Sequence, residues 1–334
     1  MDQTIALNKI RGMLAGLTIG DALGAPHEFR YNRDVPYSGK LEHKPSFMSR
    51  FQDTRHSAIG QITDDSEMSI TMIRSILRNN GYNKRDIILS YEEWANSTSM
   101  MGRNTKSLLK GVKTIPGYER RYNLALKGEL KGTNQALPDI QSNGSLMRAS
   151  PLALLFGYIY CDIDCDITNP NIVNREVNMC YVMAIKLAIM NHDPAEILST
   201  LMEKCDVPEV LAVLIEVQNK EIRNVTIKKG WVLHSFYCAM TGFVNILHQV
   251  KTYSGVIDWV ISLSGDTDTN AAITGALVGS YLGYNNMMQE EVTKNNFDIV
   301  LNCDTTKGDF PRADIYTIKD FDSLCFGLSR IGQI

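Results

Sequence analysis

Apolar and small residues recur at helical intervals along most of the chain, and the alternation typical of strands is scarce. This periodicity predicts helices over residues 9–23, 64–77, 86–94, 105–112, 145–158, 177–190, 194–203, 208–222, 232–248, 255–263, 271–282 and 319–330. A long irregular stretch rich in proline and glycine, from about 25 to 62, separates the first two helices. The helical periodicity therefore predicts an all-α protein, and its length is compatible with two domains or with one large domain.

Two of the predicted helices carry glycines at four-residue spacing. They are Gly12, Gly16, Gly20 and Gly24 at the N-terminal helix, and Gly275, Gly279 and Gly283 at the helix near 271–282. Residues four apart share one helix face. Because glycine has no side chain, such a face lets another backbone approach closely, and the pattern predicts tight packing of both helices around a shared centre.

The composition narrows the class of protein. With 334 residues and 44% hydrophobic composition, the chain can bury a large core without disulfides. A net charge of −3 with scattered basic residues does not indicate a nucleic-acid surface. The first residues lack a secretory signal pattern, and no apolar run is long enough to cross a bilayer. We therefore expect no membrane association and a reducing, cytoplasmic location. We also expect a monomer. Cys161 and Cys165 are the only close pair of the seven cysteines, and without further ligands nearby we interpret them as part of a surface loop.

Two acidic clusters about two hundred residues apart each begin a predicted helix. The first is Thr63, Asp64, Asp65 and Ser66, and the second is Asp266, Thr267, Asp268 and Thr269. Both offer hard oxygen donors without histidine or cysteine, which suits Mg²⁺, Ca²⁺ or Mn²⁺ better than zinc or copper. The simpler alternative is capping of the helix N-termini. One cap uses one side chain, however, so adjacent carboxylates exceed that need, and together the clusters could bind one or two divalent ions.

Four segments, in order along the chain, resemble the ADP-ribosylglycohydrolase family of the dinitrogenase-reductase-activating type. They are RGMLAGLTIGDALGAPHEF from Arg11, QITDDSE from Gln61, NGSLMRASPL from Asn143 and SGDTDTNAAITGALVGSYLG from Ser264. The resemblance implies a compact, all-α, single-domain multi-helix bundle over 1–334, with a core of about 8–284 on which the segment 285–334 packs. It also implies a central cleft that holds two Mg²⁺ ions, Mn²⁺ being a substitute. Ser66 departs from the family pattern, which usually has threonine there, but it keeps a hydroxyl.

The resemblance also implies roles for individual residues. The metal ligands would be Thr63, Asp64, Asp65, Asp266, Asp268 and Thr269. Glu28 and Asp65 would be catalytic. The substrate would be bound by Gly102, Asn104, Asn143, Gly144, Ser145, His192 and Trp231. Simpler interpretations remain open for several of them: an exposed loop carboxylate for Glu28, a turn before a helix for Gly102, a helix-end cap for His192, core packing for Trp231. Arg148, near Ser145, could be a structural ion-pair partner.

The function implied by the resemblance is Mg²⁺-dependent hydrolysis of the N- or O-glycosidic bond of an ADP-ribosylated substrate, with release of ADP-ribose. A protein substrate is expected, and the linkage stays open among arginine, serine, polymer, nucleic acid and small molecules. One alternative is a catalytically inactive relative that binds ADP-ribose or has a structural role. The spacing within the first cluster does not match a prenyl-diphosphate enzyme, and six histidines without a spaced set do not support a His-Asp phosphohydrolase around His192 and Asp193.

Overall fold

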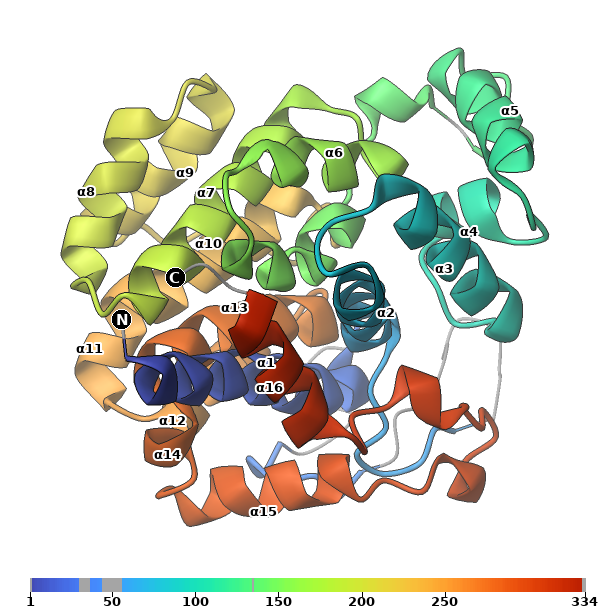
Figure 1. Cartoon of the computed structure of the whole chain (residues 1–334). Coiled ribbons are helices and arrows are strands. Elements are labelled where there is room, and N and C mark those ends of the chain that lie inside the picture. Colours follow the sequence, from blue (N-terminus) through green and yellow to red (C-terminus); the bar gives the residue numbers. More distant parts are fainter. Residues whose placement is uncertain (1, 30–36, 44–55, 134, 332–334) are drawn as a thin grey trace.

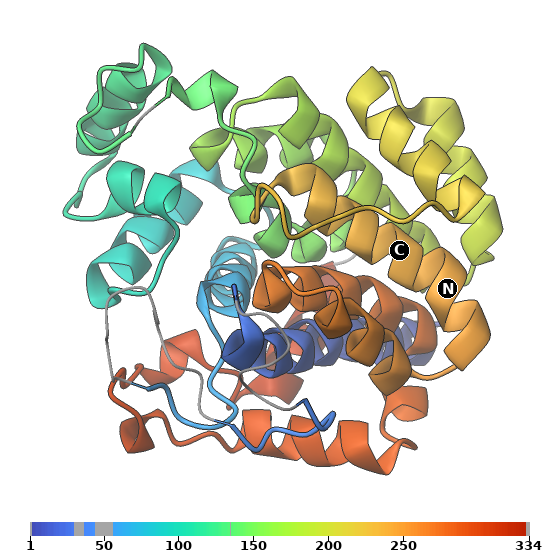
Figure 2. The ribbon, with the colours of Figure 1, turned by 180° about the vertical axis from the view of Figure 1, so that it is seen from behind.

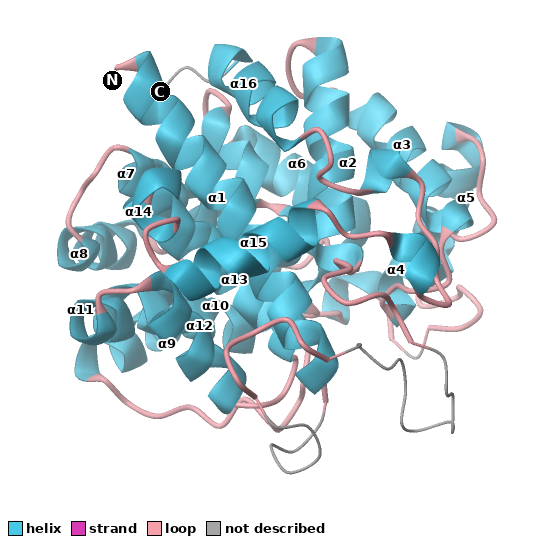
Figure 3. Ribbon diagram, turned by 90° about the horizontal axis from the view of Figure 1, so that it is seen from below, coloured by secondary structure: helices cyan, strands magenta, loops and turns pink. Residues whose placement is uncertain are grey.

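The computed structural model describes residues 2–29, 37–43, 56–133 and 135–331. Within these ranges the chain forms helices joined by loops, without any strand (Figure 3). The only β-type pairing among them is an isolated bridge between Ser142 and Trp231. The predicted all-α fold is therefore confirmed. In the described part of the chain, no helix combines the length and apolar character required to span a membrane.

The α-helices are labelled in Figure 1. They are α1 (Gln3–Gly24), α2 (Asp64–Asn79), α3 (Lys84–Ser97), α4 (Arg103–Leu109), α5 (Ile115–Leu126), α6 (Ile159–Thr168), α7 (Ile172–Ile189), α8 (Pro194–Lys204), α9 (Pro208–Asn219), α10 (Val232–Thr241), α11 (Leu247–Val250), α12 (Tyr253–Ser262), α13 (Thr267–Leu282), α14 (Tyr284–Met287), α15 (Glu291–Leu301) and α16 (Phe321–Ile331). Short 3₁₀ segments include η1 (Ala25–His27), η4 (Asn143–Arg148) and η5 (Ser150–Leu154), and η6 (Gly242–Ile246) is a π-helical turn between α10 and α11.

The helices α1 and α13 form the centre of the molecule, and they run antiparallel. A β-carbon at Gly16 would overlap the carbonyl of Gly275, and one at Gly12 would overlap that of Gly279. At the other end of the pair, a β-carbon at Gly24 would lie 2.6 Å from the α-carbon of Asp268. The predicted close packing of the two glycine-spaced helices is therefore confirmed. Since the C-terminal end of α1 meets the N-terminal end of α13, residues far apart in sequence converge there.

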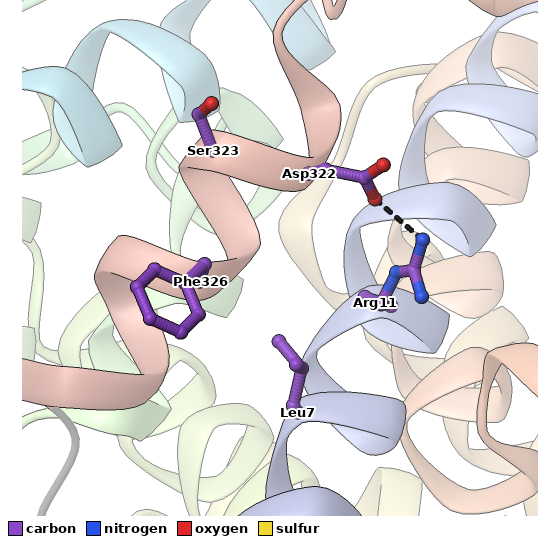
Figure 4. Close-up of a pocket in the computed structure, with 5 residues that line it drawn as sticks. All are labelled: Leu7, Arg11, Asp322, Ser323 and Phe326. Atoms are coloured by element: carbon purple, nitrogen blue, oxygen red, sulfur yellow. Dashed lines mark hydrogen bonds and ion pairs between the residues drawn. The ribbon is translucent and has the colours of Figure 1, made fainter.

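The other helices surround this pair. Figures 1 and 2 show α8 and α9 at one side of the molecule, near the N-terminal end of α1, and α3 to α5 at the opposite side. The C-terminal helix α16 packs on α1, where Arg11 forms an ion pair with Asp322 beside a surface pocket of about 410 Å³ (Figure 4). Phe326 and Leu7 also line this pocket. It lies on the N-terminal half of α1, away from the acidic clusters.

The structure corrects two predictions. The helix expected over 145–158 is instead two 3₁₀ segments, η4 and η5, followed by a loop, and Pro151 within it lacks the N–H that a continuous α-helix needs. Cys161 and Cys165 do not lie in a surface loop but are buried in α6. The helices α5, α6, α14 and α15 were not predicted. Of the long irregular stretch, residues 30–36 and 44–55 lie outside the described residues, and η1 is the only helical element in the described remainder.

Candidate active site

The C-terminal end of α1 connects the two acidic clusters. Asp21 accepts hydrogen bonds from the backbone N–H groups of Thr63 and Ser66, at 3.0 and 3.1 Å, at the start of α2. One turn further along α1, the carbonyl of Gly24 accepts a hydrogen bond from the hydroxyl of Thr267 at 2.8 Å, at the start of α13. Because one turn of helix rises about 5.4 Å, the two anchoring points are close together. The expected meeting of the clusters is therefore present in the fold.

In the first cluster, Thr63 is the N-cap of α2, as the capping alternative predicts. Its hydroxyl oxygen lies 2.8 Å from Asp21 Oδ1 and 2.9 Å from Asp65 Oδ2. Asp64 does not cap the helix, and its Oδ2 accepts a hydrogen bond from the N–H of Gly102 at 3.2 Å. Capping therefore accounts for Thr63 and leaves both carboxylates available for another role.

In the second cluster, Asp266 precedes α13 and Asp268 lies in its first turn. One carboxylate oxygen from each of Glu28, Asp266 and Asp268 lies within 4.8 Å of the others. The N–H of Thr269 donates to Asp268 Oδ1 at 2.9 Å. The segment that carries Glu28 is fixed to the same turn, because the N–H of Phe29 donates to the carbonyl of Gly265 at 2.8 Å.

Several carboxylates are buried close together at this site, and this raises their pKa values. Burial raises the pKa of Asp64 to about 7 and that of Asp21 to about 6. Burial, reinforced by neighbouring carboxylates, raises the pKa values of Asp65 and Asp268 well above the ordinary range for aspartate. The carboxylates contributing to this effect on Asp268 include Glu28 and Asp65, so the two clusters act on each other directly.

These residues fit a divalent cation. Asp65 is nearly inaccessible to solvent, yet its Oδ1 has no hydrogen-bond partner among the described residues. A buried, unpartnered carboxylate oxygen is costly, and a cation would both neutralise its charge and fill its coordination. The surrounding donors of the two clusters are carboxylates and hydroxyls, the set that Mg²⁺ and Mn²⁺ prefer.

Comparison with known proteins decides the family. The family model described as ADP-ribosylglycohydrolase matches residues 2–298. The chain belongs to the ADP-ribosylglycohydrolase family. This membership supports a hydrolase that acts on ADP-ribosyl groups in general. The recognition based on the four sequence segments is thereby confirmed.

Relatives in this family match most of the chain. The protein L543 of Acanthamoeba polyphaga mimivirus is 26% identical, over 90% of this chain and 92% of its own. The ADP-ribosylarginine hydrolase Tri1 of Pseudomonas putida is 22% identical, over 86% of this chain and 74% of its own. The ADP-ribosylhydrolase ARH3 of Danio rerio is also 22% identical, over 83% of each chain. Among solved structures, an ADP-ribosylglycohydrolase-related protein superposes with a TM-score of 0.69 at 19% identity, over 98% of this chain and 99% of the other, which shows a shared fold.

Four of the residues expected to bind substrate surround the acidic clusters. Gly102 contacts Asp64 through its N–H. Asn143 donates from Nδ2 to Asp266 Oδ2 at 2.8 Å, and its own N–H donates to the carbonyl of Gly230 next to the half-buried Trp231. Gly144 follows Asn143 and is partly exposed. Their roles in binding stay predictions, but their positions suit contact with a ligand held at the clusters.

The other three residues expected to bind substrate make contacts elsewhere in the fold, and their roles in binding stay predictions. Ser145 is fully buried, and its hydroxyl accepts a hydrogen bond from Asn178 of α7 at 3.0 Å, so it does not face the clusters. Asn104 donates from Nδ2 to the carbonyl of Thr168 at 2.6 Å, which ties the start of α4 to the end of α6.

His192 is not brought to the clusters at all. Its neighbour Asn191 accepts a hydrogen bond from Lys9, near the N-terminal end of α1. Lys9 precedes Asp21 by roughly 18 Å of helix axis. The side chain of His192 is 45% exposed and lies 3.9 Å from Glu196 in α8. Its position therefore agrees with the helix-end alternative and gives no support to contact with the substrate ribose.

Sequence reasoning missed the residues that support Asn143 and, through it, Asp266. The hydroxyl of Ser235 lies 3.0 Å from Asn143 Nδ2 and donates to Asn270 Oδ1 at 2.7 Å. Asn270 follows Asp266 by one helical turn, and this spacing could have identified it. Ser235 comes from α10, and the sequence around it carries no signal for this role.

Arg148 has the structural role that was left open for it. It is fully buried and its Nε lies 2.8 Å from Asp164 Oδ2. It also donates to the carbonyls of Gly144 and Asp164 and to the hydroxyl of Thr168. These bonds hold the segment that carries Asn143 and Gly144 against α6.

We expect Arg148→Lys to lower the free energy of unfolding by about 2–3 kcal/mol, because a lysine ammonium can neutralise Asp164 but cannot replace the planar set of hydrogen bonds. Chemical denaturation would measure the loss. Arg175→Lys is the matched control: Arg175 also forms a two-pronged pair, with Asp166, but its side chain is 37% exposed. A change below about 1 kcal/mol is expected there. Equal losses in both variants would contradict the buried role of Arg148.

Proposed function

We propose that this protein is a Mg²⁺-dependent hydrolase that cleaves the N- or O-glycosidic bond of an ADP-ribosylated substrate, expected to be a protein, and releases ADP-ribose. The observation that carries the proposal is the convergence of Glu28, Asp266 and Asp268 beside Asp65, whose Oδ1 is buried without a hydrogen-bond partner among the described residues. Two ions are proposed, held by Thr63, Asp64, Asp65, Asp266, Asp268 and Thr269. When bound, they supply positive charge that orients sugar hydroxyls and polarises water.

The protein's own residues would perform the remaining tasks. In the reaction, the bond between the anomeric carbon and the leaving nitrogen or oxygen breaks, and a water oxygen forms the new bond to that carbon. A carboxylate must take one proton from this water, and the leaving group must gain one. Glu28 is the more accessible of the two candidates for the base, since it is only partly buried, and Asp65 is the other. Asn143 would keep Asp266 oriented through its 2.8 Å hydrogen bond.

The surroundings of the clusters support a phosphate-bearing ligand. The N–H of Gly102 and the first turn of α4 lie next to Asp64, and a β-carbon at Gly102 would meet no atom within 4 Å. Backbone in such an open position can approach a diphosphate closely. Trp231 pairs with Ser142, next to Asn143, and the ammonium of Lys228 lies 5.0 Å from its ring centre, so this part of the surroundings carries positive charge. The cytoplasmic monomer expected from the sequence stays a prediction.

The proposal predicts complete dependence on a divalent cation. Purified protein would be treated with a chelator and assayed for free ADP-ribose on substrates with arginine, serine, polymer, nucleic-acid and small-molecule linkages. The arginine linkage is the first to test, because a relative is named an ADP-ribosylarginine hydrolase. We expect release from at least one substrate with Mg²⁺ and loss of activity by about a hundredfold or more without it.

Two outcomes would contradict this proposal. Full turnover by the metal-free protein would remove the role of the clusters as metal ligands. Binding of ADP-ribose without hydrolysis of any substrate in the panel, at saturating Mg²⁺, would favour the inactive relative instead.

A further inference from the structure

A second group of potential metal ligands lies outside the acidic clusters. It consists of Glu176 and Cys180 of α7 and Cys205 at the C-terminal end of α8. A carboxylate oxygen of Glu176 and the two sulfur atoms all lie within 4.8 Å of one another. We propose that these three residues form a binding site for zinc or a similar thiophilic cation, independent of the proposed hydrolase centre. We call this group the α7–α8 thiol site.

The local structure explains why the donors converge. Glu176 and Cys180 are four residues apart, so they lie on one face of α7, one turn from each other. Cys205 reaches the same point because α8 ends there and the chain turns toward α9. The N–H of Asp206 donates to Glu176 Oε1 at 3.0 Å, which fixes this carboxylate beside the two thiols. A hydrogen bond of this kind is the usual support for a metal-binding carboxylate.

The chemistry of this donor set differs from that of the acidic clusters. Two cysteine sulfurs with one carboxylate suit zinc, whereas Mg²⁺ prefers oxygen donors only. Binding would displace the two thiol protons to the solvent. Three protein ligands leave the fourth position of a tetrahedral zinc ion for water. One chain would therefore carry two sites that select different metals.

The site lies just below the surface, on the other side of α7 from the acidic clusters. Cys205 is 9% exposed and Glu176 is 8% exposed, whereas Cys180 is 1% exposed, so an ion would reach the donors from the side of Cys205 and Glu176. Asn174 and Asn178, each two residues from a thiol-site ligand, point instead toward Ser145 beneath the segment that carries Asn143. Two residues correspond to about 200° of helix rotation, which separates the two faces.

The chain provides a matched control. Cys303 is also 9% exposed and its sulfur lies 3.4 Å from the carbonyl of Ile59, but it belongs to no group of ligands in the described part of the chain. Cys303→Ser removes one thiol of the same accessibility as Cys205→Ser. Glu176→Gln is a second kind of variant, because its side-chain carbonyl can still accept the hydrogen bond from Asp206 while the charge is lost.

The test uses the reduced, full-length protein in excess Mg²⁺, so that the acidic clusters are occupied. We expect the wild type to retain one more zinc ion per chain than Cys205→Ser or Cys180→Ser, as measured by plasma mass spectrometry after gel filtration. Co²⁺ should give a near-ultraviolet charge-transfer band typical of thiolate ligands, which Cys303→Ser keeps and both other cysteine variants lose. Glu176→Gln should weaken zinc binding by about ten- to hundredfold.

Circular dichroism of the metal-free variants would confirm that they fold, and Glu176→Gln tests the site if a cysteine variant does not. Three results would overturn the proposal: a cobalt complex without the thiolate band, equal loss of zinc in Cys303→Ser and Cys205→Ser, or zinc retained by the wild type but lost in Asp65→Asn. The last result would assign the ion to the acidic clusters. None of these readouts depends on hydrolysis, so failure of the thiol site and failure of the proposed function are distinguishable.

Discussion

Asp65→Asn is expected to reduce the release of ADP-ribose by about a thousandfold or more while leaving the fold intact. Asp65 Oδ2 lies 2.9 Å from the hydroxyl of Thr63, and an amide of the same size can keep this contact. The substitution removes the charge of the one carboxylate in the first cluster whose second oxygen is buried without a partner among the described residues. The loss should therefore appear in catalysis and metal binding.

Thermal unfolding separates this effect from simple destabilisation. Mg²⁺ should raise the melting temperature of the wild type, because it binds the folded state, and should raise that of Asp65→Asn much less. Without metal, the variant should be as stable as the wild type or more stable, since burial and neighbouring carboxylates disfavour the charge on Asp65.

Asp193→Asn provides the control for the same chemical change. Asp193 caps α8 by accepting a hydrogen bond from the N–H of Ala195 at 2.8 Å, and asparagine caps helices equally well. This variant should keep its activity, its response to Mg²⁺ and its melting temperature. Activity of Asp65→Asn within tenfold of the wild type would contradict the proposed role of the first cluster.

The arrangement that forms the site could be inferred from the sequence because it depends on local patterns. Glycines spaced by four on α1 and α13 predicted a close backbone contact, and oxygen-donating residues at helix starts predicted where the clusters would lie. The antiparallel pairing of these helices then brings Asp21 and Gly24 to the starts of α2 and α13. Each step needs only spacing along one helix and the absence of side chains on its face.

Other features depend on contacts that no local pattern encodes. Ser145 begins the stretch that was predicted to be an α-helix, and the resemblance implied that it binds substrate, but its hydroxyl accepts a hydrogen bond from Asn178 of α7. Cys161 and Cys165 were predicted to lie in a surface loop because they are close along the chain without further ligands nearby, yet both are buried in α6. Cys180 and Cys205 converge only because α8 folds back along α7. Position in the fold decides these cases, and it is not a property of any short segment.

A glycine-to-alanine substitution at the α1–α13 contact should be strongly destabilising. On an ordinary helix, replacing an interior glycine by alanine adds about 1 kcal/mol of stability through helix propensity. We expect the opposite sign for Gly16→Ala, with a loss of about 3 kcal/mol or more in the free energy of unfolding. A β-carbon at Gly16 would overlap the backbone of Gly275, and backbone cannot move aside as a flexible side chain can. Chemical denaturation would measure both sign and size.

Gly102→Ala is the control for stability, because a β-carbon there would meet no atom within 4 Å and the residue has a φ of −57°. Its free energy of unfolding should change by less than about 0.5 kcal/mol. If Gly16→Ala instead matched the wild type in stability, the close approach of α1 to α13 would be wrong. The positions of Asp21 and Gly24 beside the two clusters follow from that approach. A stable Gly16→Ala protein would therefore remove the structural basis for a shared metal centre, whatever the activity of the Asp65 variant.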